Sequence, residues 1–80
     1  MTVRVRLFAV YRDLVGRAEV LLELPSGSTV REAVDALRVE TAAHSLPADP
    51  VVAVNEVYAS IDLVLEPGDE LALIPPVAGG

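Results

Sequence analysis

The group with the most distinctive chemistry in this sequence is the α-carboxylate of its last residue, Gly80. An apolar run leads to it, Leu73-Ile74-Pro75-Pro76-Val77-Ala78-Gly79. Proline lacks an N–H and has a fixed φ, so Pro75 and Pro76 end sheet pairing and lead the chain outward in an extended form. Glycine has no Cβ, so Gly79 and Gly80 can pass a channel too narrow for other residues. The pattern predicts a body over residues 1–76 and a flexible tail over residues 77–80, which reaches roughly 13 Å.

This carboxylate needs outside help to react. An α-carboxyl group has an ordinary pKa of about 3.3–3.7, so it is ionised at pH 7 and is a poor electrophile. The sequence holds no G-x-x-x-x-G-K phosphate loop and no cysteine nucleophile. We therefore expect the chain to be a substrate or cosubstrate, with the catalytic side chains on its partners.

The other candidate groups favour structural roles. The single histidine, His44, follows the expected helix without a carboxylate or nucleophile placed beside it, as a solvated loop histidine would. Glu32 and Asp35 form a carboxylate pair that fits the wet face of a helix better than acid–base or metal chemistry. The residues Ser26, Ser28, His44 and Asp49 do not suggest a catalytic triad. With one histidine and no cysteine, we expect no metal site and no bound cofactor.

Composition narrows the class of partner. The 80 residues make one small domain with a net charge of −6, which argues against nucleic acid and favours a partner with a basic docking face. The apolar residues come in short runs, so a membrane span is not expected, and the start lacks the apolar stretch of a signal peptide. We expect a cytoplasmic protein. All six basic residues are arginine. An arginine-biased genome would explain the missing lysine, and so would the need to keep nucleophiles away from an activated terminus.

The first half of the chain predicts two strands and two helical segments. Apolar and charged residues alternate over residues 3–7 and 19–24, the period of half-buried strands, and an antiparallel pairing would set arginines near glutamates. Residues 9–15 form a short helical turn that ends at Gly16. Thr29 and Glu32 form a capping box before a longer helix with an apolar face. Its wet face carries Arg31, Asp35 and Arg38.

The second half predicts short strands separated by turns. Residues 51–54 are a buried strand, and the tight turn at Asn55-Glu56 leads into residues 57–58. Residues 61–65 are apolar and ambiguous. Pro67-Gly68 suits a type II turn before the last strand, Glu70–Ile74. The order predicts an α+β fold with a mixed sheet of about four to five strands packed on one main helix, and a β-grasp arrangement fits this order.

Three apolar residues share outward parity on strands that should be neighbours, namely Phe8, Ala72 and Ile74. Together with Pro75, Pro76 and Val77 they would form an apolar face that meets a partner, since exposed contiguous apolar patches mark interfaces. The alternative is that Phe8 tucks under the following turn and Ile74 belongs to an edge of the core. The sequence favours neither.

Over its whole length the chain resembles the small subunits of molybdopterin synthases, MoaD-like sulfur carriers of the ubiquitin-like β-grasp group. The resemblance rests on Val5-Arg6-Leu7-Phe8-Ala9, Thr29-Val30, Val54-Asn55, Leu65-Glu66-Pro67-Gly68-Asp69-Glu70-Leu71-Ala72 and the ending Pro75-Pro76-Val77-Ala78-Gly79-Gly80. A terminal Gly-Gly is shared by several ubiquitin-like carriers. The Pro-Pro-Val-x-Gly-Gly ending favours the molybdopterin branch over the thiamine branch.

This resemblance implies a function for the tail. A ubiquitin-activating-like adenylyltransferase would consume ATP to adenylate Gly80, and a sulfur donor would convert the adenylate to a thiocarboxylate. Val77, Ala78 and Gly79 would then insert into the large catalytic subunit, where the sulfur passes to precursor Z, a cyclic pyranopterin monophosphate. The family's synthase is a heterotetramer with two carriers on a large-subunit dimer, so the chain itself would be a non-catalytic carrier subunit.

Three other functions stay open on the sequence. The chain could be a ubiquitin-like modifier that joins Gly80 to lysines of other proteins, or a sulfur carrier for thiamine synthesis or tRNA thiolation. It could also be an interaction module whose tail only docks.

Overall fold

The computed structural model describes residues 1–76. Its elements follow the chain in the order β1 (Thr2–Leu7), α1 (Ala9–Val15), β2 (Glu19–Glu23), α2 (Val30–Glu40), β3 (Val51–Val54), β4 (Val57–Ala59) and β5 (Glu70–Ile74). Each expected strand and helix is present within one or two residues of its expected bounds. The tail expected over residues 77–80 lies outside the described residues.

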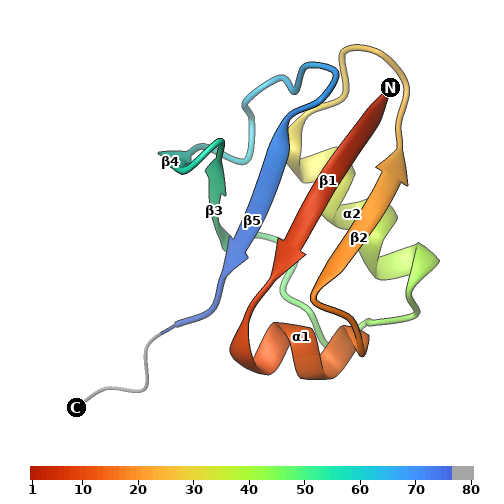
Figure 1. The fold of residues 1–80 in the computed structure, drawn as a ribbon, viewed down its shortest axis with the longest axis vertical. Helices are drawn as coiled ribbons and strands as arrows, with labels where there is room; N and C mark the ends of the chain where they lie inside the picture. The colour runs from red at the N-terminus through yellow and green to blue at the C-terminus, as the bar shows by residue number, and fades with distance from the viewer. Residues whose placement is uncertain (77–80) are drawn as a thin grey trace.

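The five strands form one mixed sheet in the order β2-β1-β5-β3-β4, seen face-on in Figure 1. β1 and β5 run parallel, with Val5 opposite Leu71 and Leu7 opposite Leu73. The other neighbours are antiparallel. The first strand therefore pairs with the last one, which confirms the expected α+β fold and its β-grasp arrangement. It also puts β5, the strand that leads to the tail, in the middle of the sheet.

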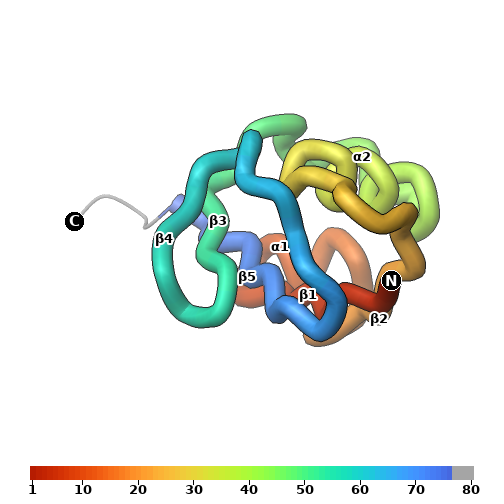
Figure 2. Tube along the Cα trace, turned by 90° about the horizontal axis from the view of Figure 1, so that it is seen from above, coloured from red at the N-terminus to blue at the C-terminus, as the bar shows by residue number. Residues whose placement is uncertain are grey.

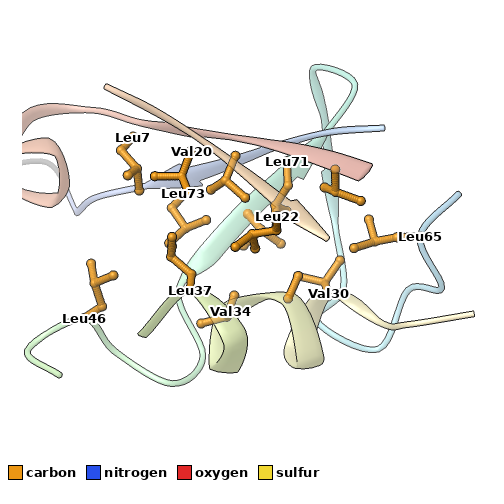
Figure 3. Packing of buried hydrophobic residues seen from close by; sticks show 14 of the residues in the cluster. Leu7, Val20, Leu22, Val30, Val34, Leu37, Leu46, Leu65, Leu71 and Leu73 are labelled. Atoms are coloured by element: carbon orange, nitrogen blue, oxygen red, sulfur yellow. The ribbon is translucent and has the colours of Figure 1, made fainter. Parts of the chain in front are cut away.

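Helix α2 covers one face of this sheet (Figure 2), whereas α1 lies beyond the ends of β1 and β2 (Figure 1). Alternate residues of a strand point to opposite faces, so one set from each strand meets the helix. The resulting core joins the α2 stripe to strand residues, as Figure 3 shows, and includes Val30, Val34, Leu37, Leu7, Val20, Leu22, Leu71 and Leu73. Each buried aliphatic side chain contributes about 1.5–3 kcal/mol, so this face holds sheet and helix together.

The start of α2 is fully paired. The predicted capping box is present, with the Glu32 N–H donating to the Thr29 hydroxyl and the Thr29 N–H donating to Glu32 Oε1 at 3.0 Å. The next orphan donors find partners in residues 61–65, because Val30 N–H donates to the Leu63 carbonyl and Arg31 N–H to the Ile61 carbonyl. The segment left ambiguous by its sequence is thus an irregular strap over the helix N-terminus rather than a strand.

The loop over residues 41–50 is anchored to the core by Ala43 and Leu46, which are buried. One expectation for this region was wrong. Arg38 is half-buried instead of lying on a fully solvated face, and its Nη2 donates to the His44 carbonyl at 3.4 Å. The reason is that the loop folds back along the last turn of α2 and covers the arginine. His44 itself is exposed.

Two turns at one end of the sheet are joined by a polar clasp around Asn55. Asn55 and Glu56 have φ of 50° and 71°, the left-handed values that a two-residue hairpin turn requires. The Asn55 Nδ2 donates to Asp69 Oδ1 at 2.9 Å, and the Glu70 N–H donates to Asn55 Oδ1 at 3.0 Å. Gly68 has φ 84° and the Asp69 N–H bonds the Glu66 carbonyl, as the predicted type II turn requires. The clasp therefore fixes the β3–β4 hairpin against the turn that enters β5.

Neither helix suits a bilayer. The longer one, α2, has 11 residues, and within residues 1–76 no helix is long and apolar enough to cross a membrane.

Candidate functional site

The stem of the tail, Pro75 and Pro76, follows directly after β5, which has a paired strand on both sides. β5 pairs with β1 on one side and with β3 on the other, and its inward residues Leu71 and Leu73 are fully buried. Pro75 follows Ile74 directly and has no N–H to offer, so the ladder stops there. The exit point of the chain is therefore set by the core rather than by a loose loop.

The residues that carry the expected chemistry come after this stem. Val77, Ala78, Gly79 and Gly80 lie outside the described residues. The reactive carboxylate and the inserting tail stay predictions.

The outward residues Phe8, Ala72 and Ile74 do lie together. They line one shallow hollow of about 290 Å³ on the sheet face opposite α2. Phe8 keeps 40% of its surface exposed and is not part of the buried core, so it does not tuck under the turn that follows it. Ile74 is half-buried and belongs neither to the buried core nor to the partly buried residues packed against it, which argues against the edge-of-core alternative. The outward direction predicted from the alternation of residues therefore correctly grouped three residues that share one surface.

The sequence reasoning missed the part of this surface that β3 and β4 supply. Ala53 lies opposite Ala72 on one side and opposite Tyr58 on the other, which makes an apolar row across three strands. Val51 lies opposite Ile74, one row further toward the stem. Tyr58 and Val51 are 75% and 58% exposed. A signal was available, because a two-residue turn at Asn55-Glu56 requires the pair Ala53–Tyr58. The all-apolar run of β3 hid which of its residues point outward.

Charge separates this apolar area from the rest of the face. Arg4 pairs with Glu19 at 3.4 Å and Arg6 with Glu70 at 3.6 Å, across β1 and its neighbours. The arginine–glutamate proximity expected for β1 and β2 is confirmed. The Arg6 guanidinium also lies 5.5 Å from the centre of the Phe8 ring. Exposed pairs of this kind add little stability. Their positions leave a charged half over β1 and β2 and an apolar half over β3, β4 and the end of β5, with Arg6, Glu56 and Glu70 at the border of the hollow that contains Phe8.

The other chemical groups are accounted for by local structure. The Ser28 hydroxyl is buried and donates to the Pro25 carbonyl, and Glu32 is committed to the capping box. His44, Asp35 and Asp49 are exposed. Within residues 1–76, no three His, Cys, Asp or Glu side chains gather where they could hold a metal ion.

The chain is similar to known proteins over nearly its whole length. The sequence profile of the ThiS family matches residues 5–80. The molybdopterin synthase sulfur carrier subunit of Arabidopsis thaliana is 37% identical over 79 residues, which cover 98% of this chain and 82% of that protein.

Two solved structures extend this comparison. The crystal structure of SAMP1 from Haloferax volcanii, a small archaeal modifier protein, superposes with a TM-score of 0.89 at 30% identity and covers 100% of both chains. The complex of subunits 1 and 2 of the molybdopterin-converting factor from Helicobacter pylori contains a chain that superposes with a TM-score of 0.71. It is 22% identical over 100% of both chains, a likeness of fold alone.

Proposed function

Because this chain belongs to the ThiS family, we propose that it is the sulfur carrier subunit of a molybdopterin synthase. The curated relative in Arabidopsis thaliana carries that name and matches nearly the whole chain. The observation that carries the proposal is the placement of the stem. A central strand delivers Pro75 and Pro76 beside an apolar surface made by Phe8, Ala72 and Ile74. A body built this way presents a terminus to another protein.

The chemistry takes place on Gly80 in three steps. An adenylyltransferase binds the carboxylate and ATP, and a carboxylate oxygen attacks the α-phosphate to give an acyl-adenylate and pyrophosphate. A sulfide-level sulfur nucleophile then attacks the acyl carbon, the bond to AMP breaks, and a thiocarboxylate remains. In the synthase this sulfur passes to precursor Z, a cyclic pyranopterin monophosphate. The body supplies no group to these steps; it binds each partner and directs the tail.

The partner that uses the sulfur is the large catalytic subunit. The Helicobacter pylori structure is a complex of subunits 1 and 2 of the molybdopterin-converting factor, which supports such a pairing for this fold. We place the large subunit on the apolar half of the sheet face and expect two carriers on a large-subunit dimer. The adenylation step consumes ATP, so we place the protein in the cytoplasm.

Intact mass spectrometry tests the proposal directly. The chain is incubated with its adenylyltransferase, ATP and a sulfur source, and the mass change of one oxygen-to-sulfur exchange at Gly80 is expected. A variant that lacks Gly80 is the control and should show no exchange. An unchanged mass for the full chain, with synthase activity kept after deletion of Gly80, would rule out the carrier function.

The docking surface has a matched pair of variants. Phe8→Asp puts a charge in the apolar half, and Leu21→Asp puts the same charge on the same face in the charged half over β2, where Leu21 is 58% exposed. We expect Phe8→Asp to weaken binding to the large subunit at least tenfold while the melting temperature holds, since Phe8 is outside the core. Leu21→Asp should bind normally. Equal losses for the two variants would remove the large subunit from this surface.

A second candidate function is protein modification through Gly80. Its support is the SAMP1 likeness, which spans the whole chain at a TM-score of 0.89. The chain has no lysine, so chains linked through its own side chains could not form. Tagged protein recovered from its native cells would appear in slower, covalently joined bands if this function operates. Bands that depend on Gly80, together with no thiocarboxylate, would favour the modifier over the carrier.

A further inference from the structure

A second hollow lies beside the root of the tail and is larger than the one under Phe8. Its volume is about 420 Å³, within the range of roughly 300–1,000 Å³ typical of binding pockets. One wall is the stem itself, Pro75 and Pro76. The opposite wall is the loop over residues 41–50, through Pro47 and Asp49, while Tyr11 and Tyr58 supply aromatic rings.

The walls of this hollow are held by the core. The loop is pinned by buried Leu46 and Ala43, Tyr11 is itself buried, and the stem continues from central strand β5. Pro50, a lining residue, is buried as well. The anchored backbone limits the ordering that binding requires, whereas the exposed side chains of Tyr58, Asp49 and Pro76 are fixed only when a partner is bound.

The chemistry of the lining selects the occupant. Among the described residues that line the hollow, Asp49 carries the formal charge, and it is exposed. Within residues 1–76 its carboxylate is in none of the ion pairs, which are Arg4–Glu19, Arg6–Glu70 and Arg31–Asp62. Val51 and Ile74 offer apolar contact. A side chain with an aliphatic shaft and a cationic, planar head satisfies the apolar walls, the aromatic rings and the carboxylate at once, and that side chain is arginine.

The hollow beside the stem adjoins the apolar half of the sheet face, where we place the large subunit. Tyr58 and Ile74 line both this hollow and the one that contains Phe8 and Ala72. A protein seated on the apolar half of the sheet face would therefore reach the stem hollow without a gap. The net charge of −6 favours a basic partner surface there.

We propose that this hollow is a subsite for an arginine side chain of the synthase large subunit, which fills the space between the loop and the stem and so fixes the direction in which the tail leaves. The inference rests on the proposed function and adds to it a charged anchor at the tail's root. The apolar surface around Phe8 provides contact area with the large subunit. The hollow that contains Asp49 fixes the position and orientation of the large subunit on that surface.

Substitutions at Asp49 test the charge. Binding of the large subunit from the same organism is measured by calorimetry at low and high salt. Asp49→Asn should weaken binding about three- to tenfold at low salt and less at high salt, and Asp49→Arg should weaken it further. Asp35→Asn, which removes an exposed carboxylate from α2, the helix that covers the other face of the sheet, is the control and should bind as the unaltered chain does. Tyr58→Phe should keep binding, whereas Tyr58→Ala should not, because the ring face is what arginine contacts.

The same complex identifies the occupant. With the large subunit labelled at arginine, nuclear Overhauser contacts are expected between arginine methylenes and the rings of Tyr58 and Tyr11. Contacts from lysine, from residues 77–80 of the same chain or from a second copy would overturn the proposal. If the unaltered chain binds and Asp49→Arg binds equally well, this subsite is wrong while the carrier function stands. If the unaltered chain does not bind the large subunit at all, both are wrong.

Discussion

Substitution of Asn55 gives a stability prediction in which the lost hydrogen bond and the added charge repulsion can be estimated separately. Asn55→Asp keeps the shape of the side chain and a residue type that tolerates the left-handed backbone at φ 50°. It also keeps Oδ1 as the acceptor for the Glu70 N–H. What changes is Nδ2, a donor 2.9 Å from Asp69 Oδ1, which becomes a second carboxylate oxygen. An attractive contact is thereby replaced by a repulsive one.

The expected cost follows from the two changes. A hydrogen bond to a charged group is worth about 1.5–3 kcal/mol, and the solvent exposure of this bond reduces the value to about 1 kcal/mol. Two like charges about 4 Å apart in water repel by about 1 kcal/mol. The variant should lose about 1–2 kcal/mol of unfolding free energy at pH 7. For a domain of this size each kcal/mol lowers the melting temperature by about 4–8 °C.

The pH dependence has a definite sign. Repulsion makes ionisation of the introduced aspartate less favourable in the folded state and raises its pKa above the unfolded value. The penalty is therefore full well above the ordinary aspartate pKa of about 3.9 and disappears as the pH falls below it. Asn55→Gly is the control, because it keeps the backbone conformation and loses the side-chain bonds without adding charge.

Thermal unfolding followed by circular dichroism at pH 7 and pH 3 measures both variants. At pH 7 Asn55→Asp should melt below Asn55→Gly or beside it, and at pH 3 it should recover relative to glycine. The reasoning is refuted if Asn55→Asp melts with the unaltered chain at pH 7, or if its deficit against Asn55→Gly grows on acidification.

Three further substitutions test the frame that holds the stem. Leu73→Ala should cost about 2–5 kcal/mol in denaturant unfolding, because Leu73 is fully buried between β1 and β3, and a loss below 1 kcal/mol would show that β5 is not held by the core. Thr29→Ala should cost about 1 kcal/mol through the lost cap, with Ser at the same position restoring most of the stability. Gly68→Ala should cost about 1 kcal/mol from φ 84° alone, since an added Cβ would meet no atom within 4 Å; an unchanged melting temperature would contradict the turn assignment.

Local patterns in the sequence were sufficient for most of the fold. Alternation placed the residues of β1, β2 and β5 on the correct faces, because the period of a strand is two. The capping box at Thr29 and the glycines at 16 and 68 marked ends and turns that depend on a few neighbouring residues. The strap over residues 61–65 and the covered Arg38 were beyond such reasoning. Both depend on contacts with segments far away in the chain, which a local pattern does not contain.

Some features of the candidate site were likewise predictable from local sequence, whereas others depend on contacts between distant segments. Amino-acid types alone correctly predicted that the last strand ends before Pro75-Pro76, because proline acts through its own covalent structure. The chemistry expected at Gly80 rests on the same kind of reasoning and stays a prediction. Amino-acid types also predicted the outward parity of Phe8, Ala72 and Ile74. The neighbours of these residues required the strand order, which brings β3 and β4 beside β5 and adds Tyr58, Val51 and Ala53 to the surface.

The hollow beside the stem required the folded molecule in full. Its walls come from α1, the loop over residues 41–50, three strands and the stem, segments that no periodicity connects. Parity states which face a side chain takes, whereas the packing of the core determines which side chains from distant segments share that face. The proposed reactive position at Gly80 therefore follows from the types of a few consecutive residues, whereas the surface beside Pro75 exists only once β1 and β3 pair with β5.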